Sequence, residues 1–556
     1  MPVQLTTKQG EALLQSNETP WTVYPRPQMR RDSYVNLNGL WELTVGEQSQ
    51  PIRVPFCPES LLSGVNHHFP EGSYLVYRRN FTLPEGFNRG RVLLHIGAAD
   101  QFTACFVNGK HLAEGYSGYT NVTFDITALL LPGENALTLS CHDDLNNQSI
   151  PYGKQVTPEK RGGMWYTPVS GIWQTVWLES VPETYIKRLR IDNRGYAVTV
   201  SIEPKQNGKV IVPTLGTFPL VDGQVTIAPE NPHLWSPEDP FLYDFTVETD
   251  TDKVESYFAI RSLEIQNNRL CLNGKPYFFH GLLDQGYWPD GLFTPAAPEC
   301  FAEDILAMKK LGFNMLRKHI KVEPEEFYYQ CDRLGMVVFQ DMVNNGDYNF
   351  LRDTALPTVG LQKLPDKRLH KDELTRRFFL DTAAATVRQL QNHPCICYWT
   401  IFNEGWGQFD SDNVYEQFKK LDDTRFIDST SGWFRQKKTD VDSRHVYFKP
   451  IRLTVGDKPL VLSEFGGYSY KPEGHVFNLD STYGYGKYAA LQDYTAAVEQ
   501  LYRKQVIPAA RKGLCAAVYT QVSDIEDETN GILSYDRKVC KLTPETMLPI
   551  AQQLTK

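Results

Sequence analysis

Strand and helix patterns alternate along the second half of the chain, and this alternation constrains the fold more than any other feature. Apolar segments are followed by amphipathic segments of helical period, which is typical of parallel strands joined by helical crossovers. Eight strands are expected within about 290 residues: YFFHGLLD, FNMLRKHI, MVVFQDMV, CICYWTIFNEG, RFIDSTSGW, RHVYFKP, PLVLSEFGG and LCAAVYTQVSD. Eight units favour a (β/α)8 TIM barrel over residues 263–556, although the helices around the fifth and sixth strands are weakly patterned.

The first 262 residues have a different pattern, in which alternating strand segments recur about every ten residues between turns rich in Gly, Pro and Asn. This spacing is typical of antiparallel β-sandwiches. We expect a β jelly roll over residues 1–181 and a smaller immunoglobulin-like β-sandwich over residues 182–262. Several domains suit a chain of 556 residues, because one hydrophobic core rarely serves more than about 250–300 residues.

Composition excludes several classes of protein. The formal net charge is −9 and no cluster of five or more Lys or Arg occurs, so no nucleic-acid partner is expected. The sequence contains no signal-peptide pattern and no run of about 18 apolar residues, so we expect no membrane partner and a cytoplasmic location. The ten cysteines lack zinc-binding spacing and are expected to be buried free thiols. No metal and no cofactor are expected, and a homo-oligomer is left open.

Polar and aromatic residues end the predicted barrel strands. In such barrels the loops at the C-terminal ends of the strands build the active site. The candidate site residues are therefore the ones at these ends: Asp284, Arg317, Lys318, His319, Asp341, Asn403, Glu404, Trp433, Tyr447, Glu464, Gln521 and Asp524.

Two glutamates in this set, Glu404 and Glu464, end the fourth and seventh strands and are expected to face each other across the barrel mouth. Hydrolysis of a glycosidic bond needs such a pair, with one carboxyl protonated and the other ionised, about 5–5.5 Å apart in a retaining enzyme. A single Glu at a strand end is more often a helix cap or a surface residue. Two of them, with Asn, Trp and Tyr at neighbouring strand ends, favour catalysis.

Aromatic and cationic residues lie close to these glutamates in sequence. Trp406 and Trp433 are either rim residues or flat surfaces on which a sugar ring stacks. The run Arg317, Lys318 and His319 is either a solvated strand end or a group that binds an anion. His319 is expected to donate a hydrogen bond rather than to bind a metal, because no second histidine lies at a useful spacing.

Several motifs resemble glycoside hydrolase family 2, the β-galactosidase and β-glucuronidase family. QNHPCICYWTIFNEG resembles its acid/base signature and LVLSEFGG resembles its nucleophile strand. Its N-terminal sugar-binding sandwich is similar to VNLNGLWEL, YRRNFTLPEG, FVNGKHL and SGIWQTVWLE. The resemblance implies the three domains in the order given above, hydrolysis of a β-linked sugar by double displacement with retention, and no cofactor.

The resemblance also implies a role for each matching residue. Glu404 would be the general acid/base and Glu464 the nucleophile. Asn403 would hold the 2-hydroxyl of the sugar, and Tyr447 would hydrogen-bond Glu464 and keep it ionised.

Two departures from the family pattern leave the sugar open. The family has Arg-x-x-His followed by Tyr-Pro on the second strand, whereas LRKHIKVEP places the histidine one position early. Glucuronidases of the family carry an Asn-x-Lys pair after the eighth strand that holds the uronate carboxylate. Here Asn530 is followed by Gly531 and Ile532, so the lysine is missing.

We expect a galactose-configured substrate, either a neutral β-galactoside or a β-galacturonide whose carboxylate pairs with the cationic second strand. The alternatives are a β-glucuronidase or another β-glycosidase of the family and, from a different class, a catalytically inactive carbohydrate-binding protein. Retention of both glutamates argues against the inactive protein. Exo action is expected because the family is mostly exo-acting. The segment from Asn345 to Lys371, about 27 residues of weak periodicity, either shapes the aglycone side or lacks structure.

Overall fold

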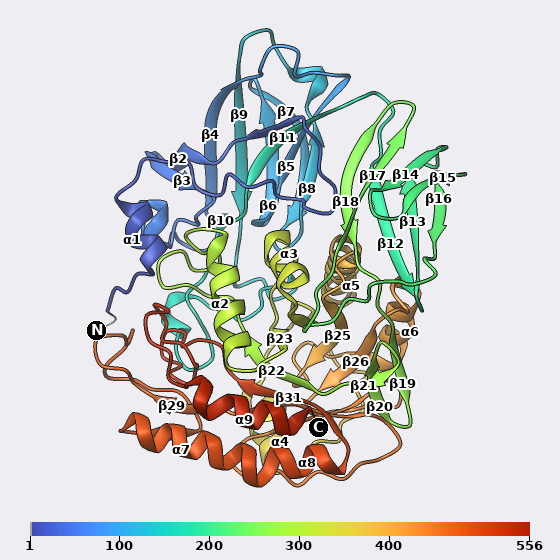
Figure 1. Cartoon of the computed structure of the whole chain (residues 1–556). Helices are drawn as coiled ribbons and strands as arrows, with labels where there is room; N and C mark the ends of the chain where they lie inside the picture. The colour runs from blue at the N-terminus through green and yellow to red at the C-terminus, as the bar shows by residue number, and fades with distance from the viewer. Residues whose placement is uncertain (1–2, 556) are drawn as a thin grey trace.

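The N-terminal region forms a sandwich of two antiparallel sheets. The computed structural model describes residues 3–555, and Figure 1 shows this sandwich at the opposite end of the molecule from the C-terminal helices. One sheet has the order β1 (Tyr34–Asn36), β11 (Val176–Val181), β5 (Arg91–Ile96) and β8 (Val122–Asp125). The other has the order β10 (Gly171–Ile172), β6 (Ala99–Val107), β9 (Glu134–His142), β4 (Tyr74–Thr82), β2 (Gly39–Val45) and β3 (Gln48–Val54), with β7 (Lys110–Ser117) paired to β6.

The side chains of this sandwich alternate between the core and the outer surface. In β9, Leu137, Leu139 and Cys141 are buried because successive side chains of a strand point to opposite faces. A short helix, α1 (Lys8–Leu14), precedes the sandwich and was not expected from the all-β pattern. Its N-cap residue Thr7 accepts a hydrogen bond from the backbone N–H of Gly10, which satisfies a donor that the helix itself cannot.

A second, smaller sandwich follows. Its two sheets have the orders β12 (Arg188–Arg194), β13 (Ala197–Glu203), β16 (Gln224–Ile227) and β15 (Gly216–Leu220), β14 (Gly208–Val212), β17 (Tyr243–Thr249), β18 (Lys253–Phe258). Val198, Val210 and Val247 lie between the sheets in a separate buried cluster. A three-stranded sheet of β19 (Leu263–Gln266), β20 (Arg269–Leu272) and β21 (Lys275–Pro276) then leads into the last domain.

The last domain is a nearly closed barrel of eight parallel strands. Their order is β26 (Phe426–Ser431), β25 (Ile396–Asn403), β24 (Val337–Asp341), β23 (Met315–Lys318), β22 (Phe279–Asp284), β31 (Leu514–Thr520), β28 (Leu460–Gly466) and β27 (Asp442–Val446). Every residue of β25 is buried, because helices cover one side of the strand and the barrel core fills the other. The predicted combination of two β-sandwiches and a TIM barrel is confirmed.

Helices lie around the barrel strands (Figure 1). They are α2 (Glu299–Lys310), α3 (Glu325–Leu334), α5 (Glu373–Leu390), α6 (Ser411–Leu421), α7 (Leu491–Leu501), α8 (Ile507–Lys512) and α9 (Pro544–Leu554). Residues 432–441 and 447–459, which follow the fifth and sixth strands, contain no helix, in agreement with the weak helical pattern there. A two-stranded sheet of β29 (Tyr468–Tyr470) and β30 (Gly486–Tyr488) lies between the seventh strand and α7.

Between strands β26 and β27, single contacts of backbone and side chains close the barrel in place of a ladder of backbone hydrogen bonds. The backbone N–H of Asp440 donates to the carbonyl oxygen of Ile427 at 2.9 Å. Further along, the hydroxyl oxygens of Ser431 and Ser443 lie 3.2 Å apart. This seam lies beside the fourth and seventh strands, which carry the two glutamates.

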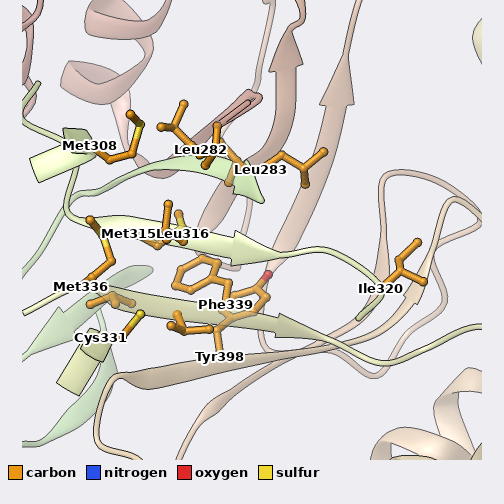
Figure 2. Packing of buried hydrophobic residues seen from close by; sticks show 14 of the residues in the cluster. Leu282, Leu283, Met308, Met315, Leu316, Ile320, Cys331, Met336, Phe339 and Tyr398 are labelled. Atoms are coloured by element: carbon orange, nitrogen blue, oxygen red, sulfur yellow. The ribbon is translucent and has the colours of Figure 1, made fainter. Parts of the chain in front are cut away.

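Large apolar side chains fill the interior of the barrel. Figure 2 shows the rings of Phe339 and Tyr398 on neighbouring strands, next to Met315 and Leu316. The two rings are stacked, with centroids 4.1 Å apart and planes inclined by 5°. This packing makes the barrel interior a solid core, so a substrate can be bound only at its mouth.

The jelly roll reaches the barrel through residues 150–173. The backbone N–H of Tyr152 donates to the carbonyl oxygen of Asn344, which follows the third barrel strand, at 3.1 Å. Trp173 is fully buried and packs edge to face on Phe293 of the barrel domain at 5.0 Å. The N-terminal domain therefore forms part of one wall of the barrel mouth.

Nine of the ten cysteines are buried and all ten are free thiols, as expected; Cys540 is exposed. Within residues 3–555, no helix is long and apolar enough to cross a membrane.

Candidate active site

The two glutamates meet at the mouth of the barrel. Glu404 directly follows β25 and Glu464 lies within β28. One ligand atom from each of Glu404, His445 and Glu464 lies within 4.8 Å of the other two. Carboxyl groups about 5–5.5 Å apart act by retention, whereas inverting enzymes hold them about 6.5–9.5 Å apart. The spacing therefore suits a nucleophile and an acid rather than two groups separated by a water molecule.

The backbone at Glu404 adopts a conformation that most residues avoid. Its φ is +52°, and Gly405 and Gly407 follow with φ of +77° and +61°. A Cβ on Gly405 would lie 2.4 Å from the ring of Phe434. Non-glycine residues in this region are uncommon and cost free energy, which tertiary contacts must offset. Hydrogen bonds on both sides hold Glu404: its N–H donates to the carbonyl of Ser431 at 2.9 Å, and its carbonyl accepts from the indole N–H of Trp433 at 2.9 Å.

Glu464 is surrounded by hydrogen-bond donors. Arg317 Nη1 donates to its Oε1 at 3.0 Å, and the Tyr447 hydroxyl donates to its Oε2 at 2.7 Å. Burial alone would raise the pKa of Glu464, but His445 and Arg317 outweigh it and lower the pKa to about 2. Glu464 is therefore ionised at neutral pH and held in a fixed orientation.

Glu404 has the opposite shift. Burial raises its pKa, a hydrogen bond from His445 opposes the rise, and the negative charge of Glu464 adds to it. Two carboxyl groups whose environments push their pKa values apart are suited to separate acid and nucleophile roles.

His445 was missed by the sequence analysis. Its Nδ1 lies 2.7 Å from Glu404 Oε1 and 3.5 Å from Glu464 Oε2, and its Nε2 lies 3.0 Å from the Ser431 hydroxyl. The sequence RHVYFKP could have identified it, because residues two apart on a strand share a face and Tyr447, two positions after His445, was a candidate site residue. Glu404, His445 and Glu464 are also the residues that could hold a divalent metal ion.

Asn403 carries an unused donor beside this pair. Its Oδ1 accepts a hydrogen bond from Arg317 Nη2 at 2.8 Å, which fixes the orientation of the amide. Its Nδ2 is buried and has no hydrogen-bond partner among residues 3–555. A buried donor without a partner is costly, so a substrate hydroxyl would satisfy it.

The three consecutive cations of the second strand do not form one positive group. They are buried rather than solvated, with 1–3% of each residue exposed. Arg317 pairs with Glu464 and, through Nε, with Asp341 at 3.0 Å. Burial and the charge of Lys154 lower the pKa of His319 to about 4, so this ring is neutral at pH 7 and lies 2.7 Å from Asp341.

Lys318 points to the opposite face of the strand from Arg317. Its Nζ donates to Asp284 at 2.7 Å and to Glu323 at 2.9 Å, and it lies 4.2 Å from the centre of the Phe327 ring on α3. The structure thus keeps Lys318 and Asp284 away from the glutamate pair. The expectation that the second strand offers free positive charge to a sugar carboxylate has no support in this geometry.

The remaining candidates lie around the mouth. Gln521 donates through Nε2 to Glu528 at 2.5 Å and to Asn530 at 2.9 Å. Asp524 pairs with Lys541 at 2.6 Å.

Both candidate tryptophans are largely covered by protein. Trp406 is 2% exposed and stacks on Trp165 of the jelly roll, with ring centroids 5.4 Å apart. Trp433 is 7% exposed and bonds to backbone carbonyls rather than lining the rim.

The segment from Asn345 to Lys371 has a defined structure. It contains a π-helical turn (Leu351–Ala355) and α4 (Leu356–Thr358). The carbonyl of Asp353 accepts from the Trp433 indole at 3.1 Å, and the carbonyl of Gln362 accepts from the N–H of Phe434 at 3.0 Å. These contacts place it against the loops that carry Glu404 and Trp433.

A barrel whose mouth holds an ionised carboxyl and a carboxyl of raised pKa within 4.8 Å has the arrangement that retaining glycoside hydrolases use. Three family models match the chain. "Glycosyl hydrolases family 2, TIM barrel domain" matches residues 263–539, "Glycosyl hydrolases family 2" matches residues 185–261, and "Glycosyl hydrolase 2 galactose-binding domain-like" matches residues 66–161. The chain belongs to glycosyl hydrolase family 2.

The named relatives include β-galactosidases and β-glucuronidases. A β-galactosidase of Thermoanaerobacter pseudethanolicus is 23% identical over 505 residues, which cover 82% of this chain and 62% of the relative. This chain therefore matches less than two thirds of that protein's length.

Solved structures show the fold. The β-D-glucuronidase of Dictyoglomus thermophilum superposes with a TM-score of 0.74 at 18% identity, covering 96% of this chain and 98% of the other. The β-galacturonidase of Eisenbergiella tayi bound to galacturonate has a TM-score of 0.69 at 18% identity, with the same coverage.

Proposed function

We propose that the protein is a retaining exo-β-glycosidase that hydrolyses terminal, galactose-configured β-linked sugars by double displacement. The observation that carries this proposal is the pair of carboxyls with opposite pKa shifts, Glu404 and Glu464, within 4.8 Å of each other.

In the first step, Glu404 gives its proton to the glycosidic oxygen while a Glu464 carboxylate oxygen attacks the anomeric carbon. The bond from that carbon to the leaving oxygen breaks, and a covalent ester between the sugar and Glu464 forms. Arg317 and Tyr447 hold Glu464 in line for this attack. The free Nδ2 of Asn403 donates to the 2-hydroxyl of the sugar, a contact that strengthens as positive charge develops on the ring.

In the second step, Glu404 is a carboxylate and takes a proton from water, whose oxygen attacks the anomeric carbon. The ester bond to Glu464 breaks, the sugar leaves with its original anomeric configuration, and Glu404 is protonated again. Glu404 can act first as an acid and then as a base, because the first step transfers its proton to the leaving group.

The β-galactosidase and the β-galacturonidase among the similar proteins support the galactose configuration, and so does Ile532, which stands where the family's glucuronidases have a lysine. The segment from Asn345 to Lys371 packs beside Glu404 and would shape the aglycone side.

Nitrophenyl β-galactoside, β-galacturonide and β-glucuronide test the substrate, and proton NMR of the first product tests the stereochemistry. We expect a galactose-configured substrate to be hydrolysed with the β-anomer released first. Release of the α-anomer would refute the retaining mechanism. Turnover of the glucuronide alone would refute the galactose configuration, and turnover of none would favour a protein that only binds carbohydrate.

A further inference from the structure

One largely buried lysine of the jelly roll, Lys154, lies beside two aromatic rings near the barrel mouth and has no ion-pair partner within residues 3–555. Lys154 is 8% exposed, yet within residues 3–555 its ammonium has no hydrogen bond and no carboxylate within 4 Å. Its Nζ lies 5.6 Å from the centre of the Trp406 ring and 5.8 Å from that of Tyr166.

The other buried lysines show how unusual this is. Each of them makes an ion pair: Lys318 with Asp284 and Glu323, Lys321 with Glu323 at 2.8 Å, and Lys541 with Asp524 at 2.6 Å. The Lys154 nitrogen keeps some contact with solvent, but the rest of the side chain is covered and no opposite charge of the described chain lies within ion-pair distance. A cation held in this way is a candidate for binding an anion from outside the chain.

The barrel holds the loop around Lys154 on both sides. The hydroxyl of Tyr152 donates to the carbonyl of Gly346 at 2.8 Å. The N–H of Thr167 donates to Glu526 at 3.0 Å. At Gly153, φ is +67° and an added Cβ would lie 3.1 Å from the carbonyl oxygen of Ile320, which directly follows His319. Such fixed anchoring pre-organises the ammonium, which lowers the entropic cost of binding a charged group.

The ammonium faces residues from several sides of the active site. Burial, the larger effect, raises the pKa of Glu404 and Glu528, and the charge of Lys154 opposes this rise. Burial lowers the pKa of His319, and the charge of Lys154 lowers it further. His319 follows the second strand and Glu528 the eighth, on either side of the first. Glu528 already accepts a hydrogen bond from Gln521 and lies more than 4 Å from Lys154. The position thus remains open to an anion.

A bound sugar would bring an anion to this place. Its anomeric carbon faces Glu404 and Glu464, and its 2-hydroxyl faces Asn403 at the end of the fourth strand. The substituents on the rest of the ring would then point towards the other strand ends, and the loop that carries Lys154 contacts Ile320 after the second strand and Glu526 after the eighth. In an unmodified hexose derivative, the group there that carries negative charge is the carboxylate of a uronic acid.

We propose that Lys154 binds the carboxylate of a β-linked hexuronide, so that a residue of the N-terminal jelly roll determines the specificity of the barrel's active site. This inference rests on the proposed function. It selects the galacturonide from the two galactose-configured substrates. It also assigns the carboxylate contact to the jelly roll, whereas Asn530 and Ile532 lie in a loop of the barrel domain.

The test compares the purified full chain with Lys154→Met, Lys154→Arg and, as a matched control, Lys160→Met, which removes an exposed charge from the same loop. Nitrophenyl β-galacturonide and β-galactoside are the substrates, and the measured quantity is the ratio of their kcat/KM values. Lys154→Met removes a charged hydrogen bond to the carboxylate of the galacturonide. The ratio should therefore fall about 10–100-fold, mainly because the KM for the galacturonide rises. Lys154→Arg should restore part of the ratio, and Lys160→Met should match the wild type.

Three outcomes would overturn the inference. An equal loss on both substrates, with an unchanged circular dichroism spectrum, would show that Lys154 has only a structural role. Turnover of the galactoside but not of the galacturonide by the wild type would refute the uronide while leaving the proposed function intact. Turnover of a sulfated galactoside in place of the galacturonide would assign the cation to a sulfate ester. Turnover of no glycoside would instead refute the proposed function itself.

Discussion

Replacing Tyr447 with Phe removes one of the two groups that hold the nucleophile and leaves the rest of the site in place. The hydroxyl of Tyr447 donates to Glu464 at 2.7 Å, while its ring stacks on Tyr485 with centroids 4.0 Å apart. Phe keeps the stacked ring. A hydrogen bond to a charged group contributes about 1.5–3 kcal/mol. Because about 1.4 kcal/mol corresponds to a factor of ten in rate, kcat/KM at neutral pH should fall about 10–150-fold.

The same substitution should change the pH dependence. Glu464 must be ionised to attack, so activity is present above its pKa of about 2 and is lost as the pH falls through that value. The Tyr447 hydroxyl is one of the groups that lower this pKa, and its removal raises it. The acidic limb of kcat/KM should therefore move to higher pH, and Arg317 and His445 should still keep it below the ordinary range of a glutamate.

The measurement is kcat/KM of Tyr447→Phe across the acidic pH range, with Tyr535→Phe as the control. It reports both the fall in rate and the shift of the acidic limb. Tyr535 is also buried, and its hydroxyl donates to the backbone carbonyl of Trp288 at 3.1 Å and not to Glu464. The control should lose some stability and keep the wild-type acidic limb. A rate within threefold of wild type and an unmoved limb in Tyr447→Phe would refute the assigned role of this hydroxyl.

Three further substitutions test other parts of the site. Asn403→Ala removes the free Nδ2, so kcat/KM should fall about 10–100-fold, while a 2-deoxy substrate should be hydrolysed equally by both enzymes; a deficit on both substrates would contradict a contact to the 2-hydroxyl. Gly405→Ala places a methyl group 2.4 Å from Phe434 at positive φ, so thermal unfolding should show a loss of about 1–3 kcal/mol, whereas Gly456→Ala, with open space around it, should be neutral. Glu404→Gln should slow cleavage of an alkyl glycoside on the order of 10²–10⁴-fold and of a dinitrophenyl glycoside much less, because a good leaving group needs no proton; equal losses would argue against the acid role.

Much of the fold follows from local patterns that the sequence displays. The eight barrel strands were recognisable because strands buried on both faces, such as Ile396–Asn403, are continuous apolar runs. Glu404 and Glu464 were recognisable because the barrel fixes which end of each strand faces the substrate. The family resemblance then gave roles to Asn403 and Tyr447, whose observed contacts suit those roles.

Orientation and distance explain what was missed. Arg317 and Lys318 are adjacent in sequence, but alternation along a strand sends one to Glu464 and the other to Glu323, so three consecutive cations do not add up to one positive site. Lys154 carries no local signal, because its position depends on how a loop of one domain docks on the barrel of another. His445 could have been found by applying the same alternation to Tyr447.

The nature of the covalent intermediate tests the central claim most directly. A 2-deoxy-2-fluoro analogue of the preferred glycoside, with a good leaving group, should form the first ester and release it slowly. Intact mass spectrometry followed by peptide mapping should find one sugar on Glu464 in the wild type and none in Glu464→Gln. A sugar on Glu404 or on any other residue, or no adduct on an enzyme that hydrolyses the parent glycoside, would contradict a nucleophile at position 464.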